Sequence, residues 1–149
     1  MEPYQATPIS AQAIRQARLE SFRARSLAVS LTVKDLQGSV TWYRDILGFT
    51  VEQEHRRDGV VRATSLIAGD VRLLIGQDDG ANGRDRVKGE GLTLMITTAQ
   101  DVDQVARRIE ERGGALASEP ADTPWGARAF SVVDPDGFGI TIASEPRRP

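Results

Sequence analysis

The segment from residue 125 to residue 143 carries the side chains best suited to binding a small molecule. Trp125 and Arg128 supply an indole and a guanidinium, which can stack on a planar molecule and hold a carboxylate or carbonyl group. Because side chains alternate along a strand, Arg128 and Phe130 should share one face. If that face lines a cavity, Phe130 forms an apolar wall below a cationic rim. In the alternative interpretation Trp125 covers the core and Arg128 is a surface ion-pair partner.

A second polar group stands at the end of an earlier predicted strand. Gln77 ends that strand, where its amide can reach the mouth of a pocket, and the glycine-rich stretch 76–91 surrounds and follows it. Three basic side chains in the stretch could clamp an anion, but acidic residues are interleaved and no helix follows to aim N–H groups. This pattern favours a solvated connector. The basic residues are Arg84, Arg86 and Lys88.

Side chains for covalent or acid–base catalysis are few. The chain contains no cysteine and a single histidine, His55, flanked by Glu52 and Glu54. His55 falls in a predicted turn, 55–59, where side chains point to water. No Ser-His-Asp set can be assembled, and no carboxylate pair is expected on strand positions that face a pocket. We therefore predict no catalytic residues.

The elements that must position these groups form one β-α-β-β-β pattern used twice. Each copy has a strand, an amphipathic helix ended by glycine, and three further strands. Tyr43 should fill the core, and its neighbour Trp42 should lie at the core margin or at a subunit contact. The predicted elements are strands at 27–33, 49–54, 60–66, 71–75, 92–97, 115–118, 127–133 and 138–142, helices at 36–47 and from residue 102, and a loop at 120–124.

The N-terminal region differs from both copies of the pattern. Residues 1–8 are predicted to be a loose arm, and Ser10 should cap a short helix at 11–22 that packs on the body or on a second subunit. The predicted organisation is an arm and helix at 1–26 followed by one domain at 27–149. That domain contains module one at 27–77, a connector at 78–90 and module two at 91–143.

The composition limits the classes of protein that the chain can represent. Its 149 residues are 40% hydrophobic and 27% charged, which fits one globular domain. The net charge of −2, with both signs interspersed, argues against a nucleic-acid partner. No apolar run approaches the ~18 residues of a membrane span, and no secretory signal is visible, so a cytoplasmic protein without a membrane partner is expected.

Three stretches together resemble a known superfamily. They are Val33-Lys-Asp-Leu with Trp-Tyr-Arg-Asp-Ile-Leu-Gly-Phe49, the helix stop Gly113-Gly114, and Val133-Asp-Pro-Asp-Gly-Phe138. With them the chain resembles the vicinal oxygen chelate superfamily, which includes glyoxalases, bleomycin-resistance proteins and dioxygenases. Over 27–143 the resemblance implies an α+β fold, in which paired βαβββ modules form an open, curled half-barrel around a pocket. It also implies a homodimer.

The resemblance implies a metal-free member. In metal-dependent relatives His or Glu ligands lie on the first and fourth strands of each module, and these positions fall near Ala28, near Leu73, within 91–94 and at Thr141. They offer at most a hydroxyl, whereas a divalent cation needs several converging N or O donors. No cofactor is therefore expected. Trp125-Gly-Ala-Arg128 also resembles the segment that opens the pocket wall in metal-free, ligand-binding members.

These observations predict a protein that sequesters a small organic ligand, as bleomycin-resistance proteins do, rather than converting it. Two alternatives stay open: a metal-dependent lyase or oxygenase with unrecognised ligands, and a structural or regulatory module. The residues expected to bind the ligand are Gln77, Trp125, Arg128, Phe130 and Thr141.

Overall fold

A computed structural model describes residues 5, 7–20, 22–83 and 85–147. Two βαβββ modules follow the N-terminal helix, as predicted. The elements are α1 (Ala11–Glu20), β1 (Val29–Val33), α2 (Leu36–Trp42) continued by the π-helical turn η1 (Tyr43–Leu47), β2 (Thr50–Arg57), β3 (Val60–Ala68), β4 (Val71–Gln77), β5 (Thr93–Thr98), α3 (Val102–Glu111), β6 (Ser118–Asp122), β7 (Arg128–Val133) and β8 (Gly139–Ser144).

Each module builds one four-stranded mixed sheet. The strand orders are β1-β4-β3-β2 and β5-β8-β7-β6, so the first strand of each module lies beside its last. The β1–β4 and β5–β8 pairs are parallel, and the other pairs are antiparallel. The sheets are open and separate, which confirms the predicted α+β fold class with paired modules.

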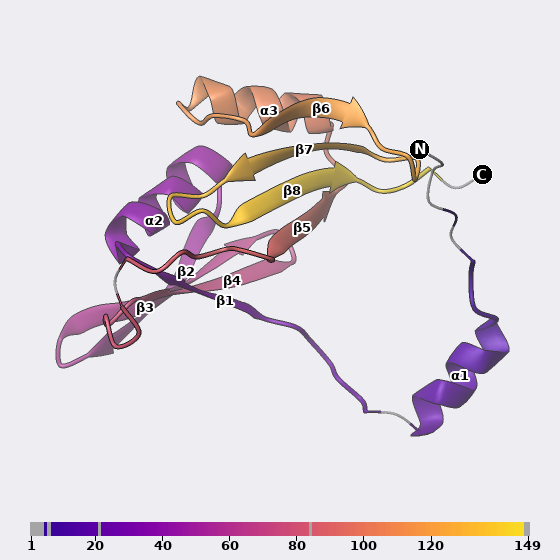
Figure 1. Ribbon diagram of the computed structural model, residues 1–149, viewed down its shortest axis with the longest axis horizontal. Helices are drawn as coiled ribbons and strands as arrows, with labels where there is room; N and C mark the ends of the chain where they lie inside the picture. Colours follow the sequence, from indigo (N-terminus) through magenta and orange to yellow (C-terminus); the bar gives the residue numbers. More distant parts are fainter. Residues whose placement is uncertain (1–4, 6, 21, 84, 148–149) are drawn as a thin grey trace.

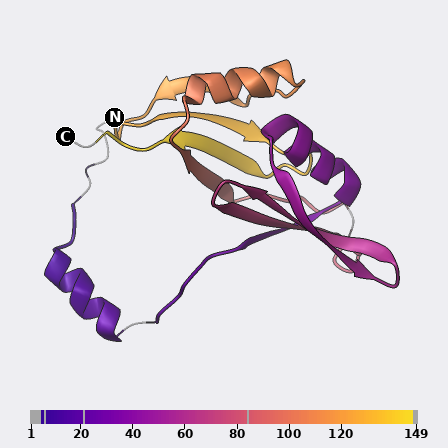
Figure 2. The same cartoon turned by 180° about the vertical axis from the view of Figure 1, so that it is seen from behind.

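The two helices of the modules lie on the same side of the molecule. In Figure 1 they lie behind the strands, and in Figure 2, from the opposite side, they lie in front. Helix α2 packs on β4 and β3, while α3 packs on β6, β7 and β8. Asp35 and Asp101 cap these helices by accepting hydrogen bonds from the backbone N–H groups of Gly38 and Gln104. Each sheet therefore has one helix-covered face and one open face.

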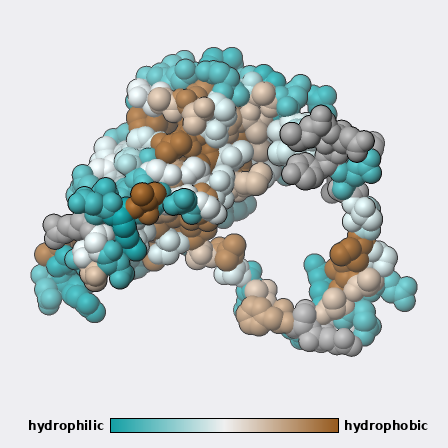
Figure 3. Space-filling model, in the orientation of Figure 1, coloured by the Kyte–Doolittle hydropathy of each residue, from teal (hydrophilic) through white to brown (hydrophobic). Residues whose placement is uncertain are grey.

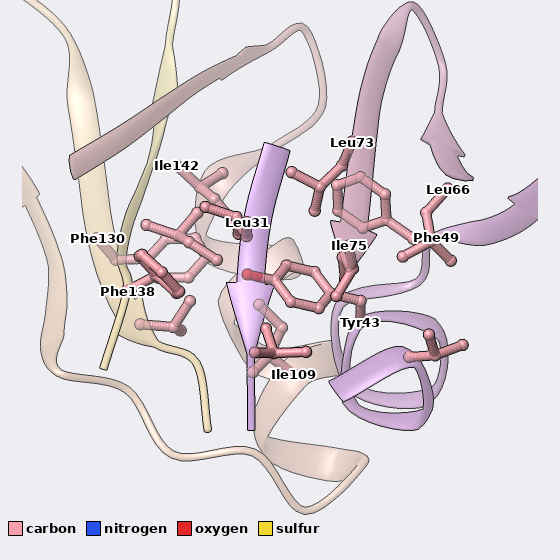
Figure 4. Packing of buried hydrophobic residues seen from close by; sticks show 14 of the residues in the cluster. Leu31, Tyr43, Phe49, Leu66, Leu73, Ile75, Ile109, Phe130, Phe138 and Ile142 are labelled. Atoms are coloured by element: carbon pink, nitrogen blue, oxygen red, sulfur yellow. The ribbon is translucent and has the colours of Figure 1, made fainter. Parts of the chain in front are cut away.

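One hydrophobic core joins the two modules (Figure 4). Tyr43 is fully buried at its centre, and its ring makes an edge-on contact with Phe49 at 5.7 Å between centroids. Trp42 is partly buried at the core margin. Both placements agree with the sequence-based prediction. Gly48, in the left-handed conformation at φ 89°, ends the helical segment as expected.

Three local predictions were wrong. Strand β2 continues through His55, and its turn to β3 is reduced to Asp58 and Gly59. Strand β6 occupies residues 118–122 rather than 115–118 and so includes 120–122, where a loop was expected, because its backbone pairs with β7 across a register shift that accommodates Pro120. The η1 turn inserts one extra residue per turn at the end of α2, which the periodicity of apolar residues did not reveal.

Candidate functional site

The open face of the module-two sheet carries a row of four side chains across its centre. In register from β5 to β6, Met95 pairs with Thr141, Thr141 with Ser131, and Ser131 with Ser118. Ser118 and Ser131 share a hydrogen bond of 2.7 Å between their hydroxyl oxygens. Met95 is 64% exposed, and Val133, also on this face, is 49% exposed. Figure 3 looks onto this face and shows hydrophobic surface over β7 and β8. The row can offer hydroxyl contacts and an apolar surface to a ligand.

The corresponding row of module one is Ser30, Leu74, Ser65 and Gln53, again in register from β1 to β2. His55, two residues further along β2, adds an imidazole to this face. Its Nε2 lies 3.0 Å from the Ser65 hydroxyl oxygen. The histidine that was predicted in a solvated turn therefore belongs to the open face. The β-bulge after Val51 shifts the alternation of side chains by one residue and so puts His55 on the open face. The sequence alone did not indicate this bulge.

The side chains of these rows do not suit a divalent metal. Leu73, the predicted equivalent of a family ligand, points to the helix side with 4% exposure, and its neighbour Leu74 takes the open-face position. The first and fourth strands then present Ser30, Leu74, Met95 and Thr141. Within the described ranges, no group of three or more His, Asp or Glu side chains is placed to hold a metal ion. A thioether, an isobutyl group and two hydroxyls do not make a site for Zn²⁺, Mn²⁺ or Fe²⁺.

Phe130 and Arg128 lie on the face of β7 that α3 covers. Phe130 is 1% exposed within the core, because the apolar stripe of α3 packs against this side of the sheet. The predicted cavity-facing orientation is therefore wrong. Arg128 makes a bidentate ion pair with Asp103 of α3, at 2.7 and 3.0 Å, and a contact of 3.1 Å with Asp122. These contacts lower the pKa of Asp103 and raise that of Arg128, chiefly through the hydrogen bonds between them.

The other predicted site residues are scattered. The Gln77 amide accepts a hydrogen bond from the N–H of Leu36 at 3.0 Å and donates one to the Lys34 carbonyl at 2.8 Å, so it joins β4 to the start of α2. Trp125 is 53% exposed in the β6–β7 connection. Of the five predicted residues, Thr141 lies in the central row of an open face. Gln77 lines one hollow of about 440 Å³, and Arg128 lines another of about 290 Å³. Their roles in ligand binding stay predictions.

A buried polar cluster joins the connector to both modules. The Lys88 ammonium lies 2.7 Å from Asp78 at the end of β4 and 3.8 Å from Asp136 in the β7–β8 turn, and all three side chains are at most 5% exposed. The hydrogen bond from Lys88 lowers the pKa of Asp78. The prediction of a solvated connector is thus wrong for Lys88. Its charge is buried because two carboxylates from separate modules converge on it.

The same β7–β8 turn contacts the first module through Asp134. The buried Asp134 carboxylate accepts a hydrogen bond of 2.7 Å from the Tyr43 hydroxyl and two from the N–H groups of Asp136 and Phe138. Burial raises the pKa of Asp134 although these hydrogen bonds oppose the shift. Burial, reinforced by the nearby carboxylate, also raises the pKa of Tyr43. Tyr43 therefore stays a hydrogen-bond donor across the ordinary pH range.

Comparison with known proteins places the chain in a family. Residues 25–142 match the model of the glyoxalase/bleomycin resistance protein/dioxygenase superfamily, and the chain belongs to that superfamily. Among sequence relatives, the anthracycline biosynthesis protein DnrV of Streptomyces peucetius is 42% identical over 48 residues. That match spans 32% of this chain and 17% of DnrV.

Solved structures of other proteins share the fold. A glyoxalase/bleomycin resistance protein/dioxygenase from Nocardioides has a TM-score of 0.68 at 21% identity, with 93% of this chain and 94% of that one covered. TnmS3, described as an antibiotic-binding protein from Streptomyces sp. CB03234, has a TM-score of 0.65 at 25% identity, with 84% and 98% covered. Among the residues described by the structure, no helix is both long and apolar enough to span a bilayer.

Proposed function

We propose that this protein binds a small, largely planar organic molecule on the open face of module two and sequesters it without a catalytic metal. The observation that carries the proposal is the central row of that face. It places a thioether and a hydroxyl, from Met95 and Thr141, on the two strands where a metal-dependent relative would need imidazoles or carboxylates, and two further hydroxyls lie beside them. Small-molecule sites are mostly apolar surfaces with a few polar groups that fix orientation, and this row has that composition.

The comparisons support the same class of ligand. One structural neighbour is an antibiotic-binding protein, and one sequence relative is an anthracycline biosynthesis protein. An exposed sheet face with Met95 at one side suits a fused-ring molecule, because the flexible thioether adapts to aromatic surfaces. Thr141, retained from the sequence-based set, supplies a hydroxyl at the centre of the row.

A second copy of the chain would complete the site. An open sheet face that exposes Met95 and Val133 is apolar surface that a monomer leaves in water. We therefore expect a homodimer whose partner chain covers this face and encloses the ligand. Light scattering at micromolar concentration checks this, and a monomer there would contradict it.

Titration with an anthracycline, followed by thermal unfolding, tests the binding proposal. Binding at 100 times the Kd stabilises a protein by about 2.7 kcal/mol. Met95→Glu should abolish the shift because it puts a charge in the row. Val60→Glu, a matched change at a 50% exposed residue outside that row, should keep it. A loss in both variants, or in neither, would count against the assigned face.

Two further measurements separate sequestration from catalysis. The purified protein should contain no stoichiometric Zn, Ni, Mn or Fe, and a chelator should leave its melting temperature unchanged. The anthracycline should be recovered with unchanged mass after incubation. One tightly bound metal per chain, or a converted ligand, would favour the metal-dependent enzyme instead.

A further inference from the structure

Helix α1 stands apart from the rest of the chain. Figures 1 and 2 both show it separated from the two sheets, at the opposite end of the molecule from α2. All the described side chains from residue 7 to residue 18 and from residue 22 to residue 28 are exposed. Four large apolar groups are among them: Ile9 at 71%, Ile14 at 44%, Phe22 at 91% and Leu27 at 92%. This arrangement leaves apolar side chains in water.

The length of α1 shows that it needs a packing partner. It has 10 residues, and isolated helices shorter than about 12–15 residues are marginal in water. Ser10 caps it by accepting a hydrogen bond of 3.1 Å from the N–H of Ala13, but a cap alone adds only about 1 kcal/mol. Ala13, Ile14 and Ala17 fall on one side of the helix. Two of these three side chains are small, so this side of the helix can approach another surface closely.

A groove suited to such a helix lies beside α2. Its volume is about 560 Å³, and it runs between the outer side of α2 and η1 and the β7–β8 turn. Trp42, Ile46 and Pro135 supply the apolar lining. The groove is on the helix-covered side of the molecule, away from the open face to which the ligand is assigned.

Charge favours the pairing of α1 with this groove. Residues 1–28 contain four arginines and two glutamates, a net charge of +2, whereas the whole chain has −2; the remainder therefore has −4. Asp35, Asp45 and Asp136 line the groove, with Lys34 as the opposing charge, and Asp45 is paired with Arg44 at 2.8 Å. Arg18 borders the apolar side of α1, so it can lie along the acidic rim when Ile14 enters the groove, whereas Arg15 faces away from it.

We infer that α1 of one chain docks in the α2 groove of a second copy. The eight residues between Glu20 and Val29 link α1 to β1 and can span at most about 29 Å when extended. In Figure 1 this linker runs from the start of β1 away from α2. The chain's own groove lies beyond the other end of β1, where its lining begins at Lys34. Two chains that exchange their helices form a closed dimer, in which each groove is filled once. The inference does not depend on ligand binding.

Disulfide trapping between single-cysteine variants tests the inference directly, because the natural chain has no cysteine. Ile14→Cys and Thr41→Cys chains are mixed and oxidised; Thr41 is an exposed residue of the groove. A disulfide needs Cβ atoms within about 4.5 Å, so trapping reports close docking. Gln12→Cys, two positions from Ile14 and therefore on another side of α1, is the matched control. The Ile14–Thr41 heterodimer should exceed the Gln12–Thr41 one about tenfold.

A second pair of variants tests the charge contribution. Arg18→Glu, added to the Ile14→Cys chain, should lower the yield of trapped heterodimer. Arg23→Glu makes the same change of charge beyond the end of α1 and should not. Equal trapping of the Gln12→Cys and Ile14→Cys chains would overturn the inference. So would a disulfide formed within one Ile14→Cys/Thr41→Cys chain, or helix formation by the arm on anionic phospholipid vesicles without trapping.

Discussion

The hairpin turns of the two modules occupy the same place in the repeat but have opposite environments. In module one, β3 and β4 are joined by Gly69 and Asp70, a short turn whose residues reach the surface. In module two, β7 and β8 are joined by Asp134-Pro-Asp-Gly-Phe138, whose two carboxylates are buried against α2 and the connector. Repetition of a fold thus does not make its parts equivalent. One turn ends a hairpin, and the other holds the modules together.

The largest loss of stability is expected when the cation between the module-two turn and the connector is removed. Lys88→Met leaves Asp78 and Asp136 buried without their shared ammonium group. Breaking a buried pair from one side is strongly destabilising, and we expect a fall of roughly 10 °C in Tm. Lys34→Met, the same change at an exposed position, should shift Tm little. Similar shifts in the two variants would contradict a special role for the module-two turn.

The pH dependence of the same pair sharpens the prediction. The pKa of Asp78 is lowered in the folded protein, so its contribution to stability is present above the ordinary aspartate pKa of about 3.9. It is lost as the pH falls through the lowered folded-state pKa. The difference in Tm between wild type and Lys88→Met should therefore narrow below pH about 4. A constant difference from pH 7 to pH 2 would contradict the assignment.

A steric change at the same contact should have the next largest effect. A Cβ at Gly89 would lie 2.5 Å from the carbonyl oxygen of Gly137 in the module-two turn, and φ there is +77°. Gly89→Ala combines a left-handed backbone with overpacking and should cost about 2–4 kcal/mol by chemical denaturation. Gly59→Ala has nearly the same φ, +75°, in open space. The difference in free energy of unfolding between the two variants measures the cost of the steric contact alone. A difference near zero would contradict a close contact between residue 89 and the module-two turn.

The hydrogen bond from module one to this turn is a weaker test. Tyr43→Phe keeps the packed ring but removes the donor to Asp134, at a cost of about 1–3 kcal/mol for a buried acceptor that keeps its two backbone partners. Unfolding of Tyr43→Phe in urea measures this cost. A Tyr43→Phe/Asp134→Asn double variant should show a non-additive loss. Additive losses would mean that the hydroxyl does not stabilise the junction through Asp134.

The smallest effect belongs to the module-one turn. Asp70→Asn removes a charge from an exposed residue and should change the free energy of unfolding by less than about 0.5 kcal/mol. A loss as large as that of Tyr43→Phe would show that both turns hold the modules together, and the comparison would fail.

The amino-acid sequence predicted the repeat, the helix caps and the core better than it predicted the site. Periodicity decides which residues are apolar together, so Tyr43, the glycine stop at Gly48 and the fold class were accessible. The face that a strand turns to the helices is decided by packing between elements distant in sequence. Phe130 and Leu73 were therefore assigned to the wrong side. Likewise, a bulge in β2 moved His55 to the open face, and bulges leave little trace in residue type.

The edge strands of the two sheets determine whether further strands can add to them at high protein concentration. Strands β2 and β6 each form one edge, and they carry charged residues, with Pro120 also in β6. Strands β1 and β5 form the opposite edges, with the uncharged sequences VSLTV and TLMITT. Charge and proline oppose the addition of further strands, whereas uncharged edges permit it. Sheet growth toward amyloid-like stacking is therefore blocked at one edge of each module and left open at the other, where a partner chain would protect it.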